Sequence, residues 1–140
     1  MREILFRAKA INRGFDKEYR TNYKNGDWVY GLVTTMYDDR FPNLPAKMKN
    51  TDGVNGIDVD YKTIGEYTGL TDKNGTEIFE GDIVKTNQYQ RSIGTETFTI
   101  EFVEGNYYLC YDGCALWTLR SFIEEVEVIG NKYDNPELIS

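Results

Sequence analysis

The stretch TGLTDKNGTEIFEGDIVKT, residues 68–86, decides the fold because two small polar clusters interrupt its β-forming residues. Asn74-Gly75 lies between two such runs, and Asn-Gly is favoured where two consecutive residues of a tight hairpin turn have positive φ. Gly81 and Asp82 form a second break just before another apolar, strand-like run. We interpret both clusters as corners of a bent sheet. A phosphate-binding loop would need closer glycines, a lysine in register and a helix that follows, and the stretch lacks that arrangement.

Further strand-like segments lie on both sides of this stretch. Near the start of the chain, Ile4, Phe6 and Ala8 alternate with charged neighbours, imperfectly because Leu5 falls on the opposite face, which predicts a strand with one wet face. Residues 28–38, WVYGLVTTMYD, predict a second strand that Gly31 would kink. The cleanest alternation in the chain is TETFTIEF, residues 95–102. Other strands are expected in residues 57–70, 106–111 and 125–131, and a short helical turn in residues 114–125.

These elements predict a mainly β protein of the α+β class, built as a small bent sheet. One domain over residues 1–140 is expected, with two lobes, because the length suits one hydrophobic core or two small ones. The first lobe would span 1–62 and the second 63–140, where about five short strands suggest an SH3-like barrel. Residues 38–56 hold two of the three prolines and no periodicity, so they predict a flexible loop within the first lobe.

Charge is distributed unevenly along the chain, whose formal net charge is -7. Residues 1–70 carry 11 basic and 10 acidic residues, whereas residues 71–140 carry 5 and 13. An acidic surface repels phosphate, so nucleic-acid binding is disfavoured. No apolar run approaches the roughly 20 residues that cross a bilayer, and charges interrupt the N-terminal apolar residues. We therefore expect a cytoplasmic protein that does not enter a membrane.

The chain has no histidine, which excludes Ser/His/Asp and Cys/His catalysis. Its two cysteines, Cys110 and Cys114, are too few for a disulfide scaffold or a four-ligand zinc site. Asp112 between them would oppose a redox thiolate, so we interpret the pair as small apolar residues around a turn. No cofactor, metal ligand or catalytic residue is predicted on these grounds.

Two acidic groups and one aromatic group remain as candidates for function. Asp58 and Asp60 would share a strand face, where paired carboxylates serve as acid and base or bind a cation, although a solvated edge strand explains them as well. Glu124, Glu125 and Glu127 have the same bland explanation. A base-stacking platform would need a basic groove, so the aromatic cluster predicts core packing or a protein interface instead. The four aromatic residues are Tyr107, Tyr108, Tyr111 and Trp117.

Three segments of the chain resemble the YopX family of phages and prophages. They are REILFRA (residues 2–8), TIGEYTGLTDKNGTEIFEGDIV (63–84) and VIGNKYDNPEL (128–138). The resemblance implies a mixed, mainly β fold with an SH3-like barrel towards the C-terminus. It also implies a phage-encoded protein of the bacterial cytoplasm that can form homo-oligomers. It implies no activity and no catalytic residues, since none are defined for the family.

Three functions follow as hypotheses. The first is a non-catalytic binding or adaptor module that contacts a host or phage protein. The second is an acidic mimic of nucleic acid that occupies the basic groove of a host DNA-handling enzyme, which needs surface carboxylates at about phosphate spacing. The third is an enzyme that uses carboxylates, with Asp58 and Asp60 as its candidates.

Overall fold

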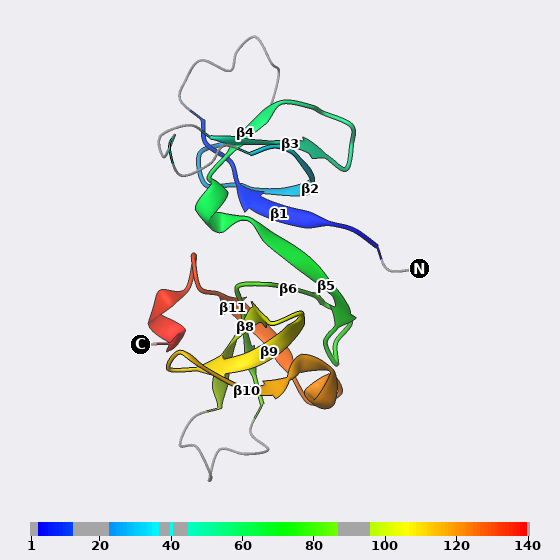
Figure 1. The fold of residues 1–140 in the computed structure, drawn as a ribbon, viewed down its shortest axis with the longest axis vertical. Helices are drawn as coiled ribbons and strands as arrows, with labels where there is room; N and C mark the ends of the chain where they lie inside the picture. Colours follow the sequence, from blue (N-terminus) through cyan, green and yellow to red (C-terminus); the bar gives the residue numbers. More distant parts are fainter. Residues whose placement is uncertain (1–2, 13–22, 37–39, 41–44, 87–95, 140) are drawn as a thin grey trace. The chain divides into compact units, whose positions relative to one another are not determined.

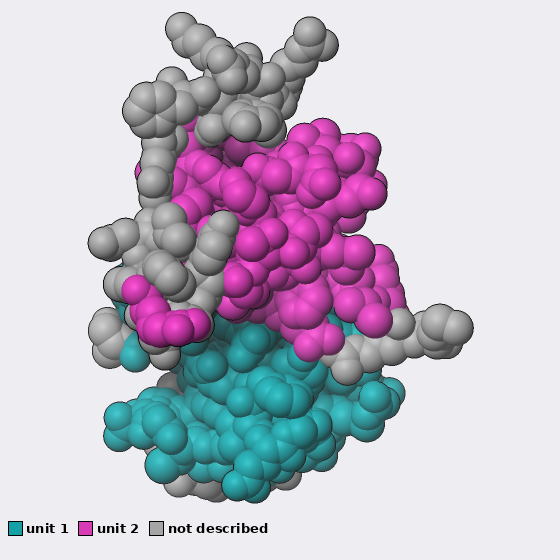
Figure 2. All heavy atoms as spheres, turned by 45° about the horizontal axis from the view of Figure 1, so that its top comes forward, with its two compact units in different colours: residues 1–2, 67–140 teal, residues 3–66 magenta. Residues whose placement is uncertain are grey.

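The computed structural model describes residues 3–12, 23–36, 40, 45–86 and 96–139 (Figure 1). Residue contacts divide the chain into two compact units, drawn in different colours in Figure 2. The N-terminal unit is Glu3–Glu66, and the C-terminal unit is Met1–Arg2 with Tyr67–Ser140. The chain passes from one unit to the other within strand β5 (Gly65–Thr71), a few residues after the boundary at 62 expected from the sequence.

Four short antiparallel strands and the start of β5 build the N-terminal unit. β1 pairs with both β2 and β5, and β3 lies between β2 and β4. An isolated antiparallel β-bridge between Ala10 and Val59 connects the end of β4 to the residue that follows β1. The alanines Ala8 on β1 and Ala46 on β3 leave room for this tight curl around a core that includes Met48. The strands are β1 (Phe6–Lys9), β2 (Trp28–Thr35), β3 (Ala46–Asn50) and β4 (Ile57–Val59), followed by the 3-10 helix η2 (Tyr61–Thr63).

Residues 46–50 form strand β3, so the expectation of a flexible loop over residues 38–56 is wrong for this part. Residues 46–50 read AKMKN, and their burial alternates so that Met48 lies in the core while its lysine neighbours face outward. The two prolines of the segment, Pro42 and Pro45, come before the first residue of this strand in the sequence, so they do not interrupt its hydrogen bonds. The remaining part of the expected loop, residues 38–39 and 41–44, lies outside the described residues.

A five-stranded antiparallel sheet, in the order β10-β9-β8-β7-β11, builds most of the C-terminal unit. A hairpin of β5 and β6 accompanies it. Phe98 and Ile100 of β8 point into the core with Leu109 of β9, as the alternation of residues 95–102 predicts. The elements are β6 (Glu77–Phe79), β7 (Asp82–Lys85), β8 (Thr97–Val103), β9 (Asn106–Tyr111), β10 (Cys114–Thr118), η3 (Leu119–Phe122), β11 (Glu127–Asn131) and η4 (Pro136–Ile139).

The mainly β class is confirmed, but two finer expectations are not. All helical turns among the described residues are 3-10 turns, so an α+β class is not confirmed. Residues 114–118, expected in a helical turn, pair with β9 instead, and this leaves only four residues for η3. The described strands of the C-terminal unit form a sheet with β10 and β11 at its two edges, and no closed SH3-like barrel is found among them. Within the described ranges, no helix is both long and apolar enough to cross a membrane.

The opening stretch folds as a hairpin and a corner, with one difference from the expected turn. Residues 72–76 connect β5 to β6, and Gly75 has φ +85° whereas Asn74 has no positive φ. The loop is therefore longer than a two-residue turn, and the Asp72 carboxylate holds it by accepting the backbone N–H groups of Asn74 and Thr76 at 2.8 and 2.9 Å. At the second corner, buried Asp82 accepts the Phe79 N–H at 2.7 Å.

The C-terminal signature packs directly on these two corners. Val128 N donates to the second oxygen of Asp72 at 2.9 Å, and Lys132 N donates to the Gly81 carbonyl at 2.9 Å. A Cβ at Gly81 would lie 3.1 Å from the Tyr133 ring, and its φ of +90° also favours glycine. Residues 63–84 and 128–138, which carry most of the family resemblance, are thus held together by these hydrogen bonds.

Candidate functional site

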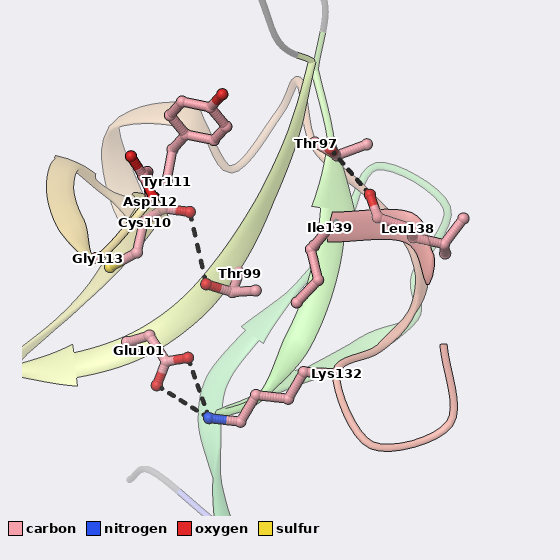
Figure 3. A pocket seen from close by; sticks show the side chains of 10 residues that line it. All are labelled: Thr97, Thr99, Glu101, Cys110, Tyr111, Asp112, Gly113, Lys132, Leu138 and Ile139. Atoms are coloured by element: carbon pink, nitrogen blue, oxygen red, sulfur yellow. Dashed lines mark hydrogen bonds and ion pairs between the residues drawn. The ribbon is translucent and has the colours of Figure 1, made fainter. Parts of the chain in front are cut away.

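A cavity of about 510 Å³ opens on the outer face of the five-stranded sheet (Figure 3). Its floor comes from β8 and β9, one wall from the turn that follows β9, and the other wall from η4 and the chain before it. We call this cavity the η4 groove. Its lining residues are Thr97, Thr99, Glu101, Cys110, Tyr111, Asp112, Gly113, Lys132, Leu138 and Ile139.

The floor follows from the alternation of β8. Because Phe98 and Ile100 point into the core, Thr97, Thr99 and Glu101 must point to the opposite face. The Thr99 hydroxyl donates to the carbonyl of Cys110 on the neighbouring strand at 3.5 Å. The floor is consequently polar and held in register by the sheet.

The η4 wall is fixed by an asparagine at the end of β11. The Asn131 side-chain oxygen accepts the backbone N–H groups of Tyr133 and Asp134 at 3.1 and 2.9 Å, which turns the chain back towards the sheet. The Thr97 hydroxyl then donates to the Leu138 carbonyl at 3.3 Å. Ile139, 42% exposed, extends from η4 towards the floor in Figure 3.

The opposite wall is a tight turn between β9 and β10. Asp112 and Gly113 have φ of +49° and +77°, so this is the turn with two consecutive positive φ values that a two-residue hairpin favours. Aspartate tolerates the left-handed region better than most residues. The turn places the exposed Tyr111 ring and the Asp112 carboxylate at the edge of the groove (Figure 3).

One ion pair joins the floor of the groove to the η4 wall. Lys132 Nζ lies 3.2 Å from Glu101 Oε1, and both side chains are about one-third exposed. Burial alone would lower the pKa of Lys132, but the Glu101 carboxylate, with smaller effects from Tyr133 and Glu80, raises that pKa above the ordinary lysine value. The ammonium therefore stays protonated at neutral pH, and a neutral amine nucleophile is not formed here.

The groove also contains one of the two cysteines. Both cysteines are free, Cys110 buried and Cys114 exposed. Burial, followed by the negative charge of Glu101, raises the pKa of the Cys110 thiol above its ordinary value. A reactive cysteine needs a lowered pKa and access to solvent, so Cys110 has the opposite surroundings.

We expect the two thiols to differ in reactivity by at least about tenfold, because the thiolate is the reacting form and only Cys114 is accessible. The measurement compares iodoacetamide alkylation rates at pH 8 in Cys114→Ser, which leaves Cys110, and in Cys110→Ser, which leaves Cys114. Adding Glu101→Gln to the Cys114→Ser protein should lower the pKa of Cys110. Equal rates at the two positions would contradict this assignment.

Asp58 and Asp60, the two aspartates predicted to share a strand face, have different interaction partners. Asp58 lies in β4, where its carboxylate is 2.6 Å from Lys47 Nζ on the neighbouring strand. Asp60 comes after the end of β4 and accepts the Lys62 N–H at 3.0 Å as the cap of η2. Asp60 itself is still extended and η2 begins only at Tyr61, but the separate partners give the two carboxylates different structural roles.

The predicted aromatic cluster is divided between two faces of the sheet. Tyr107 is buried in the core, and Trp117 packs on that core with an edge-on contact to Phe98. Tyr108 is half-buried, and Tyr111 is 43% exposed at the groove. Of these four, only Tyr111 lines the groove, because the β9 turn carries it there.

Sequence reasoning missed Lys132 and Ile139, which lie 31 and 38 residues after Glu101 in the chain. The available signal was the polar face of β8, but the sequence pattern does not show which element lies over that face. Among the described residues, no group of three or more Cys, Asp or Glu side chains is placed to hold a metal ion. A second cavity of about 500 Å³ lies in the N-terminal unit, lined by Ile4, Leu32 and the turn after β3 among others.

The fold and the groove define a mainly β protein of two units with an open groove in the second. The chain belongs to the YopX family, because the family model described as YopX protein matches residues 12–140. Among solved structures, the chain is similar to protein EF1440 from Enterococcus faecalis, with 23% identity, 100% of each chain covered and a TM-score of 0.55. At that identity the likeness shows the fold alone. A search of curated proteins finds no match.

Proposed function

We propose that this YopX-family protein is a non-catalytic protein-binding or adaptor module of the bacterial cytoplasm that contacts a host or phage protein. The observation that carries the proposal is the open η4 groove, whose lining mixes hydroxyls, an ion pair and an apolar side chain. Its lysine is held as an ammonium by Glu101, and its cysteine is held as a neutral thiol. Both pKa shifts are opposite to those that activate a nucleophile, which argues against nucleophilic catalysis by these two groups.

The size and lining of the groove support the same proposal. A volume of about 510 Å³ falls within the range of ordinary ligand sites. The lining combines threonine hydroxyls, an ion pair and the apolar side chain of Ile139, which is the mixture that protein interfaces use. Its floor is a regular strand, so the binding groups are presented on a rigid element.

We expect the tagged protein to recover a partner from infected or lysogenic cells, and expect Ile139→Asn to reduce that recovery at least about fivefold by placing a polar group in the contact. Leu116→Asn is the matched control, because Leu116 is 37% exposed on β10 of the same unit but lies outside the groove. Native mass measurement of the recovered assembly gives its composition and reports any homo-oligomer. Recovery of no protein above background would contradict the proposed function.

The acidic mimic remains the alternative. Two carboxylates of the acidic half, Asp72 and Asp82, are buried and bind backbone N–H groups, so they add nothing to a phosphate-like surface. The alternative therefore depends on exposed acids such as Glu124 and Glu104. A carboxylate enzyme loses its motivating pair, since Asp58 and Asp60 have separate partners.

A further inference from the structure

The η4 groove is charged asymmetrically. Its lining carries two carboxylates, Glu101 and Asp112, and one ammonium, Lys132. The ammonium is already paired with Glu101, whereas no lysine or arginine among the described residues pairs with Asp112. The half of the chain that contains the groove also has 13 acidic and only 5 basic residues. A positively charged ligand is therefore complementary to the groove at short range and to its surroundings at long range.

A tyrosine lines the same wall of the groove as this carboxylate. Tyr111 directly precedes Asp112, and 43% of its surface is exposed. A lysine or arginine side chain can pack on a tyrosine face while its charge meets a carboxylate, and the ring contributes most where the cation is partly desolvated. Tyr111 and Asp112 thus supply two independent attractions for one cationic group.

The floor sets the shape of the ligand. It runs along β8 from Thr97 to Glu101, which at ~3.3 Å per residue is about 13 Å. This length matches about four residues of an extended peptide. Ile139 on the η4 wall offers an apolar contact on the side across from the turn. Because successive side chains of an extended peptide point in opposite directions, one can reach the η4 wall while its neighbours reach the wall formed by the turn.

We infer that the η4 groove binds an extended segment of a partner protein that carries a lysine or arginine, seating the cation against Tyr111 and Asp112 and an apolar side chain against Ile139. This inference rests on the proposed protein-binding function and names the chemistry of the partner. An acidic segment is disfavoured, since it would meet Asp112 directly and would have to compete with Glu101 for Lys132.

The test is selection from a library of random capped hexapeptides against the full chain, followed by fluorescence anisotropy with the enriched peptides. We expect enrichment of lysine or arginine beside apolar residues. Replacing the basic residue of an enriched peptide by glutamine should weaken binding about tenfold, and raising the salt concentration should weaken it further. In the protein, we expect about a threefold loss from Asp112→Asn and about a fivefold loss from Tyr111→Ala.

Glu104→Gln is the matched control. Glu104 has φ +48°, precedes a glycine with positive φ, and is exposed in the β8–β9 turn outside the groove. Glu104→Gln therefore removes the same charge from the same kind of turn, and peptide binding should not change. Asp112→Asn keeps a residue that tolerates positive φ, so the fold should remain intact.

Three outcomes would overturn the inference: no enrichment, enrichment of acidic or purely neutral peptides, or equal losses from Asp112→Asn and Glu104→Gln. The proposed function is judged separately by recovery of a cellular partner. If a partner is recovered and lost with Ile139→Asn while the peptides show no preference for positive charge, the protein-binding function stands and the inference about its partner fails.

Discussion

Gly31→Ala is expected to destabilise the N-terminal unit by about 3 kcal/mol, because its methyl group has no space. A Cβ built on Gly31 would collide with the Lys49 carbonyl oxygen and lie 2.8 Å from Asn50 Cα. These are backbone atoms of β3, the strand with which β2 pairs at this position, so no rotamer change relieves the contact. The two strands would have to separate, with the loss of ladder hydrogen bonds.

Denaturant unfolding of the Gly31→Ala protein measures this effect, and hydrogen exchange locates it. We expect the loss of protection to concentrate on amides of β2 and β3. Leu32→Ala is the control on the same strand, and it should cost less than about 1 kcal/mol because Leu32 is 48% exposed. Wild-type protection at β2 and β3 in Gly31→Ala would show that the strands accommodate a side chain there.

Asp72→Ala is expected to destabilise the C-terminal unit by about 2 kcal/mol, since it removes the shared acceptor of three partly buried backbone hydrogen bonds. The Asp72 carboxylate accepts three N–H groups, two from its own loop and one from Val128, which is 56 residues away. Its removal therefore loosens both the hairpin and the attachment of β11. Glu77→Gln, an exposed acid in the same hairpin, is the matched control and should change stability by less than about 0.5 kcal/mol.

The same residue predicts a pH dependence. Burial would raise the pKa of Asp72, but the N–H groups of Val128, Thr76 and Asn74, aided by Lys73, lower it below the ordinary value of 3.8. A lowered folded-state pKa means that the ionised form stabilises the fold above pH 4, and that this contribution is lost as the pH falls through the folded-state pKa. Unfolding free energies measured from pH 6 to pH 2 should fall less steeply for Asp72→Asn than for wild type. Parallel curves would contradict the assignment.

The motif that carries the family resemblance is structural in this protein. Asp72 and Gly81 are the contacts by which the hairpin and the corner hold β11 and the residues after it. That attachment positions Lys132 and η4, which form one wall of the groove. The conspicuous small and polar residues therefore act on the groove indirectly, by fixing the backbone that surrounds it.

Local patterns in the sequence determined the strands and most of the corners. Alternation placed Phe98 and Ile100 in the core and the threonines of β8 outside, because side chains of a strand point to opposite faces in turn. The same reasoning placed Asp58 and Asp60 two residues apart on extended backbone, but it could not show their separate partners, the Lys47 ammonium and the Lys62 N–H. It also missed β3, because AKMKN contains one large apolar residue and its burial depends on partners from β2 and β4.

Only the tertiary structure decided the groove. Glu101, Asp112 and Ile139 come from a strand, a turn and a 3-10 helix, and no local pattern shows which of them meet. Their meeting depends on hydrogen bonds between residues 31 to 56 positions apart, such as Lys132 with Glu101 and Val128 with Asp72. Local propensity acts over a few neighbouring residues, whereas such contacts form only once the whole sheet is assembled.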